Sequence, residues 1–269
     1  MKKIAIIFDF DETLVEESTS AFLEKNGVNI DKFWGETVKS LIDEDWDPVP
    51  AYMFKMIELS MSKSISKSDL TSFSKELKYK KGVKQLFANL KEYISTISSN
   101  FDIEYYIISS GIGDIIRNSS IARNFTDIWA SEFQYDLNEQ IIFPKKVLSF
   151  TDKTRYIFQI SKGMVGEEYR SKPYVVNDKY DSGSYVIPIE NMIYIGDGLT
   201  DVPCFSLLKK NNGIAIAVYD AQNTLAYGKA WQFVKEDRVT NLNSADYTKG
   251  SDLYNTIIMA IESIISKGK

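Results

Sequence analysis

The chain has 269 residues, of which 44% are hydrophobic, with a net charge of −5 and a pI near 5.1. This length suffices for one large domain or two smaller ones, and the acidic balance argues against nucleic acid as a partner. No apolar run approaches the roughly 18 residues of a membrane helix, and the apolar stretch after Met1 is too short for a signal peptide. Because the single cysteine, Cys204, can form no internal disulfide, we expect a cytosolic protein without a membrane segment.

The composition also lacks histidine entirely. This excludes Ser-His-Asp and Cys-His catalysis and any zinc site with histidine ligands. Acid–base chemistry must then come from Asp, Glu, Lys, Tyr or the lone Cys. A metal site would be built mainly from oxygen atoms, which favours magnesium or calcium.

Residues 3–8 (KIAIIF) are predicted to form a strand that is buried on both faces. Asp9 and Asp11 follow it two positions apart, and we expect their side chains to point to the same side, because strand side chains alternate with period two. The carboxyl end of a central parallel strand is where open α/β sheets bind ligands. The alternative is that both residues only form a turn, in which Asp is common.

Residues 15–80 show no strand pattern, and helices are predicted at 16–25, 31–43, 49–62 and 68–78. Aromatic and Met side chains would give this segment a small core of its own (Trp34, Trp46, Tyr52, Met53, Phe54, Met56). A helical insertion directly after the first strand suggests a lid or cap.

Beyond residue 80, strands alternate with helices. We expect helices at 82–98, 152–162 and 251–267, and Thr151 as the N-cap of the second helix. We expect strands at 103–108, 128–135, 140–148, 192–195 and 214–218. Residues 169–189 are expected to be irregular. This alternation predicts a doubly wound parallel sheet. Strand ends at Asp9, Ser109 and Asp197 would therefore lie side by side along one edge.

This placement would bring together Asp9, Asp11, Asp197 and Asp201. Like charges about 4 Å apart repel by roughly 4 kcal/mol at an effective dielectric near 20, so a bare cluster is unstable. A divalent cation relieves the repulsion, and an oxygen-only site suits Mg²⁺. Such a site would attract a phosphate group, and a carboxylate can attack it to form an aspartyl-phosphate.

At these positions the sequence resembles the haloacid dehalogenase superfamily of phosphohydrolases. Asp9-Phe-Asp11-Glu-Thr13 is similar to the family's first motif, Asp-x-Asp-x-Thr, and residues 196–201 (GDGLTD) are similar to its fourth. The resemblance implies that Asp9 is the nucleophile and that Asp11 is the general acid/base, which also offers its carbonyl to the metal. It implies further that Asp197 is a direct metal ligand and that Asp201 ligates it directly or through water.

The second and third motifs are less specific. Ser109 resembles the Ser or Thr that hydrogen-bonds the phosphoryl group, although the adjacent Ser110 could do so, and Gly111 completes this phosphate-binding stretch. Lys153 resembles the single lysine of the third motif because it precedes the strand that carries the fourth. Lys145, Lys146 and Lys162 compete for that role.

The resemblance implies a Rossmann-like core formed by residues 1–14 and 81–269, and a helical type-one cap at 15–80, as in phosphoserine phosphatase-like members. It predicts an Mg²⁺-dependent phosphatase acting on a small phosphorylated metabolite. Phosphoserine itself is not supported, because no arginine precedes Arg117 to clamp a substrate carboxylate. The alternatives are a phosphotransferase or mutase of the same superfamily, and a non-catalytic protein that binds a phosphorylated ligand. Gly111-Ile-Gly113 could suggest a dinucleotide fingerprint, but Ile116 replaces its third glycine.

Overall fold

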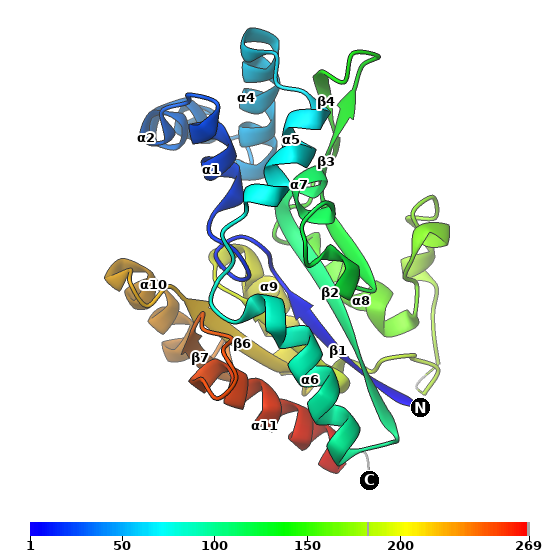
Figure 1. The fold of residues 1–269 in the computed structure, drawn as a ribbon. Helices are drawn as coiled ribbons and strands as arrows, with labels where there is room; N and C mark the ends of the chain where they lie inside the picture. The colour runs from blue at the N-terminus through cyan, green and yellow to red at the C-terminus, as the bar shows by residue number, and fades with distance from the viewer. Residues whose placement is uncertain (182, 268–269) are drawn as a thin grey trace.

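A computed structural model of the chain describes residues 1–181 and 183–267, and it is built around one sheet (Figure 1). Within those residues the sheet has seven strands in the order β4-β3-β2-β1-β5-β6-β7. They are β1 (Lys2–Phe8), β2 (Phe101–Ile112), β3 (Asp127–Tyr135), β4 (Ile141–Lys146), β5 (Met192–Gly196), β6 (Ile214–Tyr219) and β7 (Asn241–Ser244). β4 runs antiparallel to β3, and the other neighbouring pairs are parallel. The predicted α/β fold with a parallel sheet is confirmed.

β1 lies at the centre of the sheet, between β2 and β5. Its last residue, Phe8, is level with Ile107 of β2 and Ile195 of β5. Because these three strands are parallel and in this register, the residues that follow them emerge at the same edge. This register is what brings the ends of distant chain segments together.

The two faces of the sheet are covered by different helices. Ile4, Ile6 and Phe8 belong to the hydrophobic core that includes α6 (Val83–Ile97) and α11 (Asp252–Lys267). Ala5 and Ile7 belong to the core that includes α8 (Lys153–Lys162), α9 (Val202–Lys210) and α10 (Thr224–Lys235). Alternate β1 residues thus face opposite layers, as expected for a strand buried on both faces.

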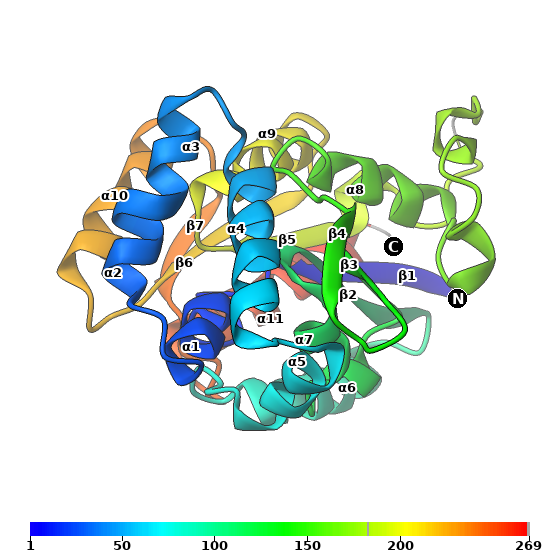
Figure 2. The ribbon, with the colours of Figure 1, turned by 90° about the horizontal axis from the view of Figure 1, so that it is seen from above.

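A helical segment lies beyond the carboxyl edge of the strands, with α4 crossing in front of the sheet when seen from above (Figures 1 and 2). It comprises α1 (Ser18–Lys25), α2 (Ile30–Lys32), a π-helical stretch (Phe33–Val38), α3 (Lys39–Asp43), α4 (Pro48–Lys63), α5 (Lys67–Phe73) and a 3-10 turn (Ser74–Glu76). Its two connections to the sheet run side by side, since Glu16 N donates to Lys78 O and Lys80 N donates to Leu14 O. The division into a core domain and a 15–80 cap domain stays a prediction.

Some local expectations differ from the structure. β2 continues four residues beyond its predicted end at Ile108, before the short helix α7 (Gly113–Arg117). The expectation that Thr151 caps α8 is wrong, because Asp152 occupies the N-cap position and makes no side-chain capping hydrogen bond. β7 and α10 were not predicted. Among the described residues, no helix is long and apolar enough to cross a membrane.

Candidate active site

A pocket of about 280 Å³ opens at the carboxyl edge of β1, β2 and β5, below the helical segment. The chain reaches it from several elements that are distant in sequence. Its lining residues are Asp9, Asp11, Glu12, Glu17, Thr19, Trp34, Tyr52, Ser109, Ser110, Gly111, Asp197, Gly198, Leu199 and Thr200. The structure therefore brings most of the predicted site residues to one cavity, with Lys153 and Asp201 directly behind it.

Lys153, the first residue of α8, is fully buried beneath this pocket. Its Nζ donates hydrogen bonds to Asp9 Oδ2 at 2.8 Å and to Asp201 Oδ1 at 2.7 Å, and it lies 3.3 Å from Thr200 Oγ1. Burial alone would lower the pKa of Lys153, but the Asp201 and Asp9 carboxylates outweigh it and raise that pKa above its usual range. The competing lysines lie elsewhere: Lys162 binds backbone carbonyls and Lys146 lies near Glu132.

Asp9 follows β1 and is almost fully buried. Its Oδ1 accepts a hydrogen bond from Phe10 N at 2.7 Å, and its Oδ2 accepts the bond from Lys153. Burial raises the pKa of Asp9 to about 6; Lys153 opposes this rise and the Asp201 charge adds to it. The carboxylate is therefore held in a fixed orientation and is mainly ionised at neutral pH.

Asp197 and Asp201 contribute different things, although both come from the stretch after β5. Each can place a carboxylate oxygen in a group with Asp9 in which the oxygens lie within 4.8 Å of one another. Asp201 is fully buried and bonded by Tyr194 OH, Gly198 N and Lys153. Asp197 faces the pocket, and its Oδ1 accepts one bond from Thr13 Oγ1 at 3.3 Å.

The Asp197 carboxylate lies close to two other negative charges. Burial raises the pKa of Asp197 well above its usual range, and the Asp201 and Asp9 charges raise it further. The Lys153 charge opposes this rise but does not cancel it. A further cation would stabilise such a carboxylate, and oxygen ligands suit a hard divalent ion. The residues present therefore fit a metal between Asp9 and Asp197.

Asp11 lies in the same pocket but outside that close group of carboxylates. Its Oδ1 accepts a 2.7 Å hydrogen bond from Ser18 N at the start of α1. Burial raises the pKa of Asp11 to about 8, and the nearby Glu17 charge contributes. A Cβ atom at Gly111 would lie 2.4 Å from Asp11 Oδ2, so glycine is needed for this approach.

The predicted phosphate-binding stretch lines the wall formed by β2. Ser109 Oγ accepts a hydrogen bond from Gly111 N at 3.0 Å. Ser110 Oγ is buried and has no hydrogen-bond partner among the described residues, while its carbonyl accepts from Tyr52 OH at 2.7 Å. Ser109 therefore has a hydroxyl proton to offer, and Ser110 has an unsatisfied hydroxyl, so both stay candidates for contacting a phosphoryl group.

Sequence reasoning missed the contribution of the helical segment to the pocket, namely Glu17, Trp34 and Tyr52. The Glu17 carboxylate accepts hydrogen bonds from Thr19 N and Ser20 N, which caps α1. The Trp34 and Tyr52 rings meet edge to face with centroids 5.9 Å apart. Tyr52 belongs to the hydrophobic core and Trp34 packs against it, as the sequence predicts, but both rings also line the pocket. The sequence carries no local signal for this second role.

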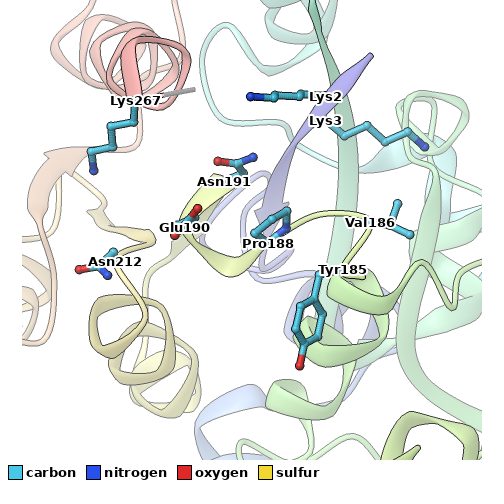
Figure 3. A pocket seen from close by; sticks show the side chains of 9 residues that line it. All are labelled: Lys2, Lys3, Tyr185, Val186, Pro188, Glu190, Asn191, Asn212 and Lys267. Carbon is cyan, nitrogen blue, oxygen red and sulfur yellow. The ribbon is translucent and has the colours of Figure 1, made fainter. Parts of the chain in front are cut away.

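A larger cavity of about 550 Å³ lies at the opposite edge of the sheet, near the start of β1 (Figure 3). Lys2, Lys3, Glu190 and Lys267 are among the residues that line it. It is separated from Asp9 by the length of β1, about 20 Å at 3.3 Å per residue. This cavity contains none of the predicted site residues, so size alone does not identify the active site.

Solved structures with a similar fold include phosphoserine phosphatases and a haloacid dehalogenase family hydrolase. A phospho-aspartyl intermediate analogue of phosphoserine phosphatase aligns with a TM-score of 0.58 and 15% identity over 96% of this chain and 99% of that one. A substrate-bound phosphoserine phosphatase aligns equally well, at 16% identity over the same shares. A haloacid dehalogenase family hydrolase from Salmonella enterica serovar Typhi gives 0.57 and 14%, covering 88% of this chain and 66% of that one.

The chain thus has the haloacid dehalogenase superfamily fold of the phosphoserine phosphatase-like type, which confirms the fold predicted from its motifs. No family model matches the sequence. A protein of Borreliella burgdorferi, described as uncharacterized, is 30% identical over an alignment of 286 positions that covers 96% of this chain and 96% of that one. The chain belongs to the same family as that protein.

Proposed function

We propose that this protein is an Mg²⁺-dependent phosphatase that hydrolyses a small phosphate monoester through a phospho-Asp9 intermediate. The observation that carries the proposal is the arrangement at the pocket floor. Lys153 Nζ lies 2.8 Å from Asp9, and Asp197 and Asp201 oxygens lie beside it. A carboxylate that is oriented by a buried cation and faces an open pocket is suited to attack an electrophile.

In the first step, an Asp9 oxygen attacks the phosphorus atom, and the bond between phosphorus and the alcohol oxygen breaks. The leaving oxygen needs a proton. Asp11, with its pKa raised to about 8, carries one at neutral pH and lies in the same pocket. A general acid is most effective when its pKa is near the working pH. The products of this step are the free alcohol, phospho-Asp9 and an ionised Asp11.

In the second step, the ionised Asp11 accepts a proton from a water molecule as that water attacks phospho-Asp9. The bond between Asp9 and phosphorus breaks, inorganic phosphate leaves, and both carboxyl groups return to their starting states. Lys153 stabilises the negative charge on Asp9 and the phosphoryl group throughout. The hydroxyl of Ser109 or Ser110 and the amide of Gly111 would hold the phosphoryl oxygens.

Asp9 and Asp197 would hold the metal, with Asp11 offering its carbonyl and Asp201 supporting from behind. When bound, Mg²⁺ would neutralise carboxylate and phosphate charge that otherwise repel each other. The helical segment, proposed as a cap domain at residues 15–80, would keep bulk water away from Asp9 in the first step.

The pocket walls also restrict the alcohol part of the substrate. No lysine or arginine lines the pocket in the part of the chain that the structure describes, whereas Glu17, Trp34 and Tyr52 do. A carboxylate on the substrate would have no cationic partner there. We therefore propose that the substrate alcohol is neutral or positively charged.

Phosphate release from a panel of phosphorylated metabolites, measured with Mg²⁺ and with EDTA, tests this proposal. We expect Mg²⁺-dependent release and a loss of at least about a thousandfold in Asp9→Asn, which removes the nucleophile. Asp252→Asn is the matched control, because Asp252 is exposed at the start of α11. Unchanged turnover in Asp9→Asn, or transfer of phosphate only to an added alcohol, would reject the hydrolytic mechanism.

A further inference from the structure

A second charged cavity, of about 50 Å³, lies where β3, β4, α8 and the turn Glu167–Tyr169 meet. Cationic and aromatic side chains dominate its lining, which includes Trp129, Lys146, Arg155, Tyr156 and Arg170. It shares no lining residue with the catalytic pocket. The mechanism proposed above does not use any of these side chains.

Arg155 lines this cavity and carries one guanidinium nitrogen with no hydrogen-bond partner among the described residues. Its Nη2 donates to Asp152 Oδ2 at 2.9 Å and to Tyr156 OH at 2.6 Å, and its guanidinium lies 4.7 Å from the centroid of the Tyr156 ring. Its Nε is buried and has no hydrogen-bond partner among the described residues. A buried unpaired donor on a charged group is unfavourable by about 1–3 kcal/mol or more, so an acceptor at this place would be stabilising.

Lys146 lacks a close counter-ion. Its nearest carboxylate oxygen, Glu132 Oε1, is 3.6 Å away and is shared with Arg117 at 2.8 Å. Burial lowers the pKa of Lys146, Glu132 opposes this, and the charges of Arg117, Arg170 and Arg155 lower the pKa further. The ammonium group therefore lies in a field of like charges.

The carboxylates around the cavity are already engaged. Asp127 accepts from Arg170 Nη2 at 2.9 Å and from Gly166 N at 2.7 Å. Asp152 is bonded to Arg155, and Glu132 is bonded to Arg117. The cationic side chains that line the cavity therefore keep N–H donors that no carboxylate accepts.

We propose that this cavity binds a tetrahedral oxyanion, either free phosphate or sulfate or the terminal phosphate of a metabolite. Arg155 and Arg170 supply guanidinium donors that match such an ion, and Lys146 supplies a point charge. The cavity has room for a small oxyanion. The bound ion would connect α8, whose first residue is Lys153, to β4 and to the turn that carries Arg170.

Two tryptophans allow both cavities to be observed in one titration. Trp129 lines this cavity and Trp34 lines the catalytic pocket. The full chain is labelled with 5-fluorotryptophan, its ¹⁹F resonances are assigned with single Trp→Phe variants, and sulfate is added at constant ionic strength in EDTA. We expect a saturable shift of the Trp129 resonance while the Trp34 resonance stays in place.

Variants test which side chains hold the ion. Lys146→Gln and Arg170→Gln should each weaken sulfate binding at least tenfold. Arg238→Gln is the matched control, because Arg238 contacts Glu236 and Ser206 outside this cavity and its loss should leave the affinity unchanged. No saturable Trp129 shift, a shift of Trp34 alone, or equal affinity in all variants, which would mean an adventitious ion only, overturns the proposal.

Further arms of the titration identify the source of the oxyanion. Inorganic phosphate and glycerol phosphate are compared in the Asp9→Asn variant, which prevents turnover. If both shift Trp129, the site accepts the terminal phosphate of a metabolite. If inorganic phosphate alone does so, the ligand is the free ion. Neither outcome depends on catalysis, so this site can fail or succeed independently of the proposed phosphatase activity.

Discussion

The floor and the roof of the catalytic pocket are built in different ways. The floor consists of Asp9, Lys153, Asp197 and Asp201, and three of these four are buried. Lys153 Nζ bonds to both Asp9 and Asp201, and these bonds link the residue after β1, the start of α8 and the stretch after β5. Asp197 lies beside them and accepts a bond from Thr13 Oγ1, so each charge in the floor is held by a defined neighbour.

The roof consists of Glu17, Trp34 and Tyr52 from the helical segment. Its polar contacts to β2 and to Asp11 are single hydrogen bonds, from Tyr52 OH to Ser110 O and from Ser18 N to Asp11. The difference teaches that the floor is fixed by the sheet, whereas the roof is carried by the helical segment. That segment is joined to the core through two adjacent connections and also bonds to it near β4, through Ser60 and Lys67. Disruption of the floor should abolish chemistry, and changes in the roof should alter selectivity.

The largest effect is expected for Lys153→Met in the floor. The Asp9 and Asp201 carboxylates would lose their buried cation, and breaking a buried ion pair costs about 3–5 kcal/mol. Activity should fall by about a thousandfold as well, because charge on the phosphoryl group is no longer compensated. Urea unfolding and phosphate release measure the two effects.

Lys209→Met is the control for Lys153→Met. Lys209 lies on the neighbouring helix α9 and pairs with the exposed Asp237, so its loss should change the free energy of unfolding by less than about 1 kcal/mol. If both variants lost the same stability, Lys153 would be an ordinary structural lysine and the floor would not be the charge-coupled unit described above.

A second, smaller effect follows from the raised pKa values in the metal-free protein. The pKa of Asp9 is about 6 and that of Asp11 about 8, whereas an unfolded Asp titrates near 3.9. Between these values the folded state binds more protons than the unfolded state, so stability falls as pH rises. In EDTA, the free energy of unfolding should be lower at pH 8.5 than at pH 5.5, by on the order of 4 kcal/mol, most of it from Asp11.

Urea unfolding at the two pH values checks this dependence. Asp11→Asn should flatten it, because the variant has no proton to lose at this position. Mg²⁺ should restore stability at pH 8.5, since it binds the folded state only. If stability instead rises between pH 5.5 and 8.5 in EDTA, the negative charges of the floor carboxylates and of Asp11 are already balanced by the protein without a metal.

The floor could be predicted from sequence because its residues are tied to local patterns. The KIAIIF run predicts a buried strand that ends at Asp9, and the GDGLTD stretch marks the end of another buried strand. Parallel pairing of the two strands then brings Asp9 and Asp197 to one edge. Lys153 was found through its order in the chain. The difference between Asp197 and Asp201 could not be predicted from the sequence. Asp201 accepts hydrogen bonds from Tyr194 OH and Gly198 N, and these contacts depend on three-dimensional packing.

The roof and the oxyanion cavity could not be predicted for a related reason. Trp34 is brought beside Tyr52 by the packing of the π-helical stretch against α4, and no spacing in the sequence encodes that contact. Arg155 lies in α8 and Arg170 follows the turn Glu167–Tyr169, and no periodicity in the sequence relates the two positions. The start of α8 is likewise one residue later than the sequence predicts, because Thr151 has a side chain suited to capping whereas the N-cap position is taken by Asp152 without a side-chain hydrogen bond.

The smallest effect is expected in the roof, from Glu17→Gln. Its carboxylate is the charged group that the roof offers to the alcohol part of a substrate, so its loss should reduce the preference for a phosphorylated amino alcohol over glycerol phosphate. One charge in a partly solvated pocket changes the ratio of the two kcat/KM values by roughly three- to tenfold. The ratio is the right measure because Glu17 also raises the pKa of Asp11, which affects both substrates alike.

Glu16→Gln is the control, since Glu16 is exposed and pairs with Lys78. If Glu17→Gln leaves the ratio unchanged, Glu17 serves only to cap α1 and to tune Asp11, and selectivity must come from the aromatic rings instead.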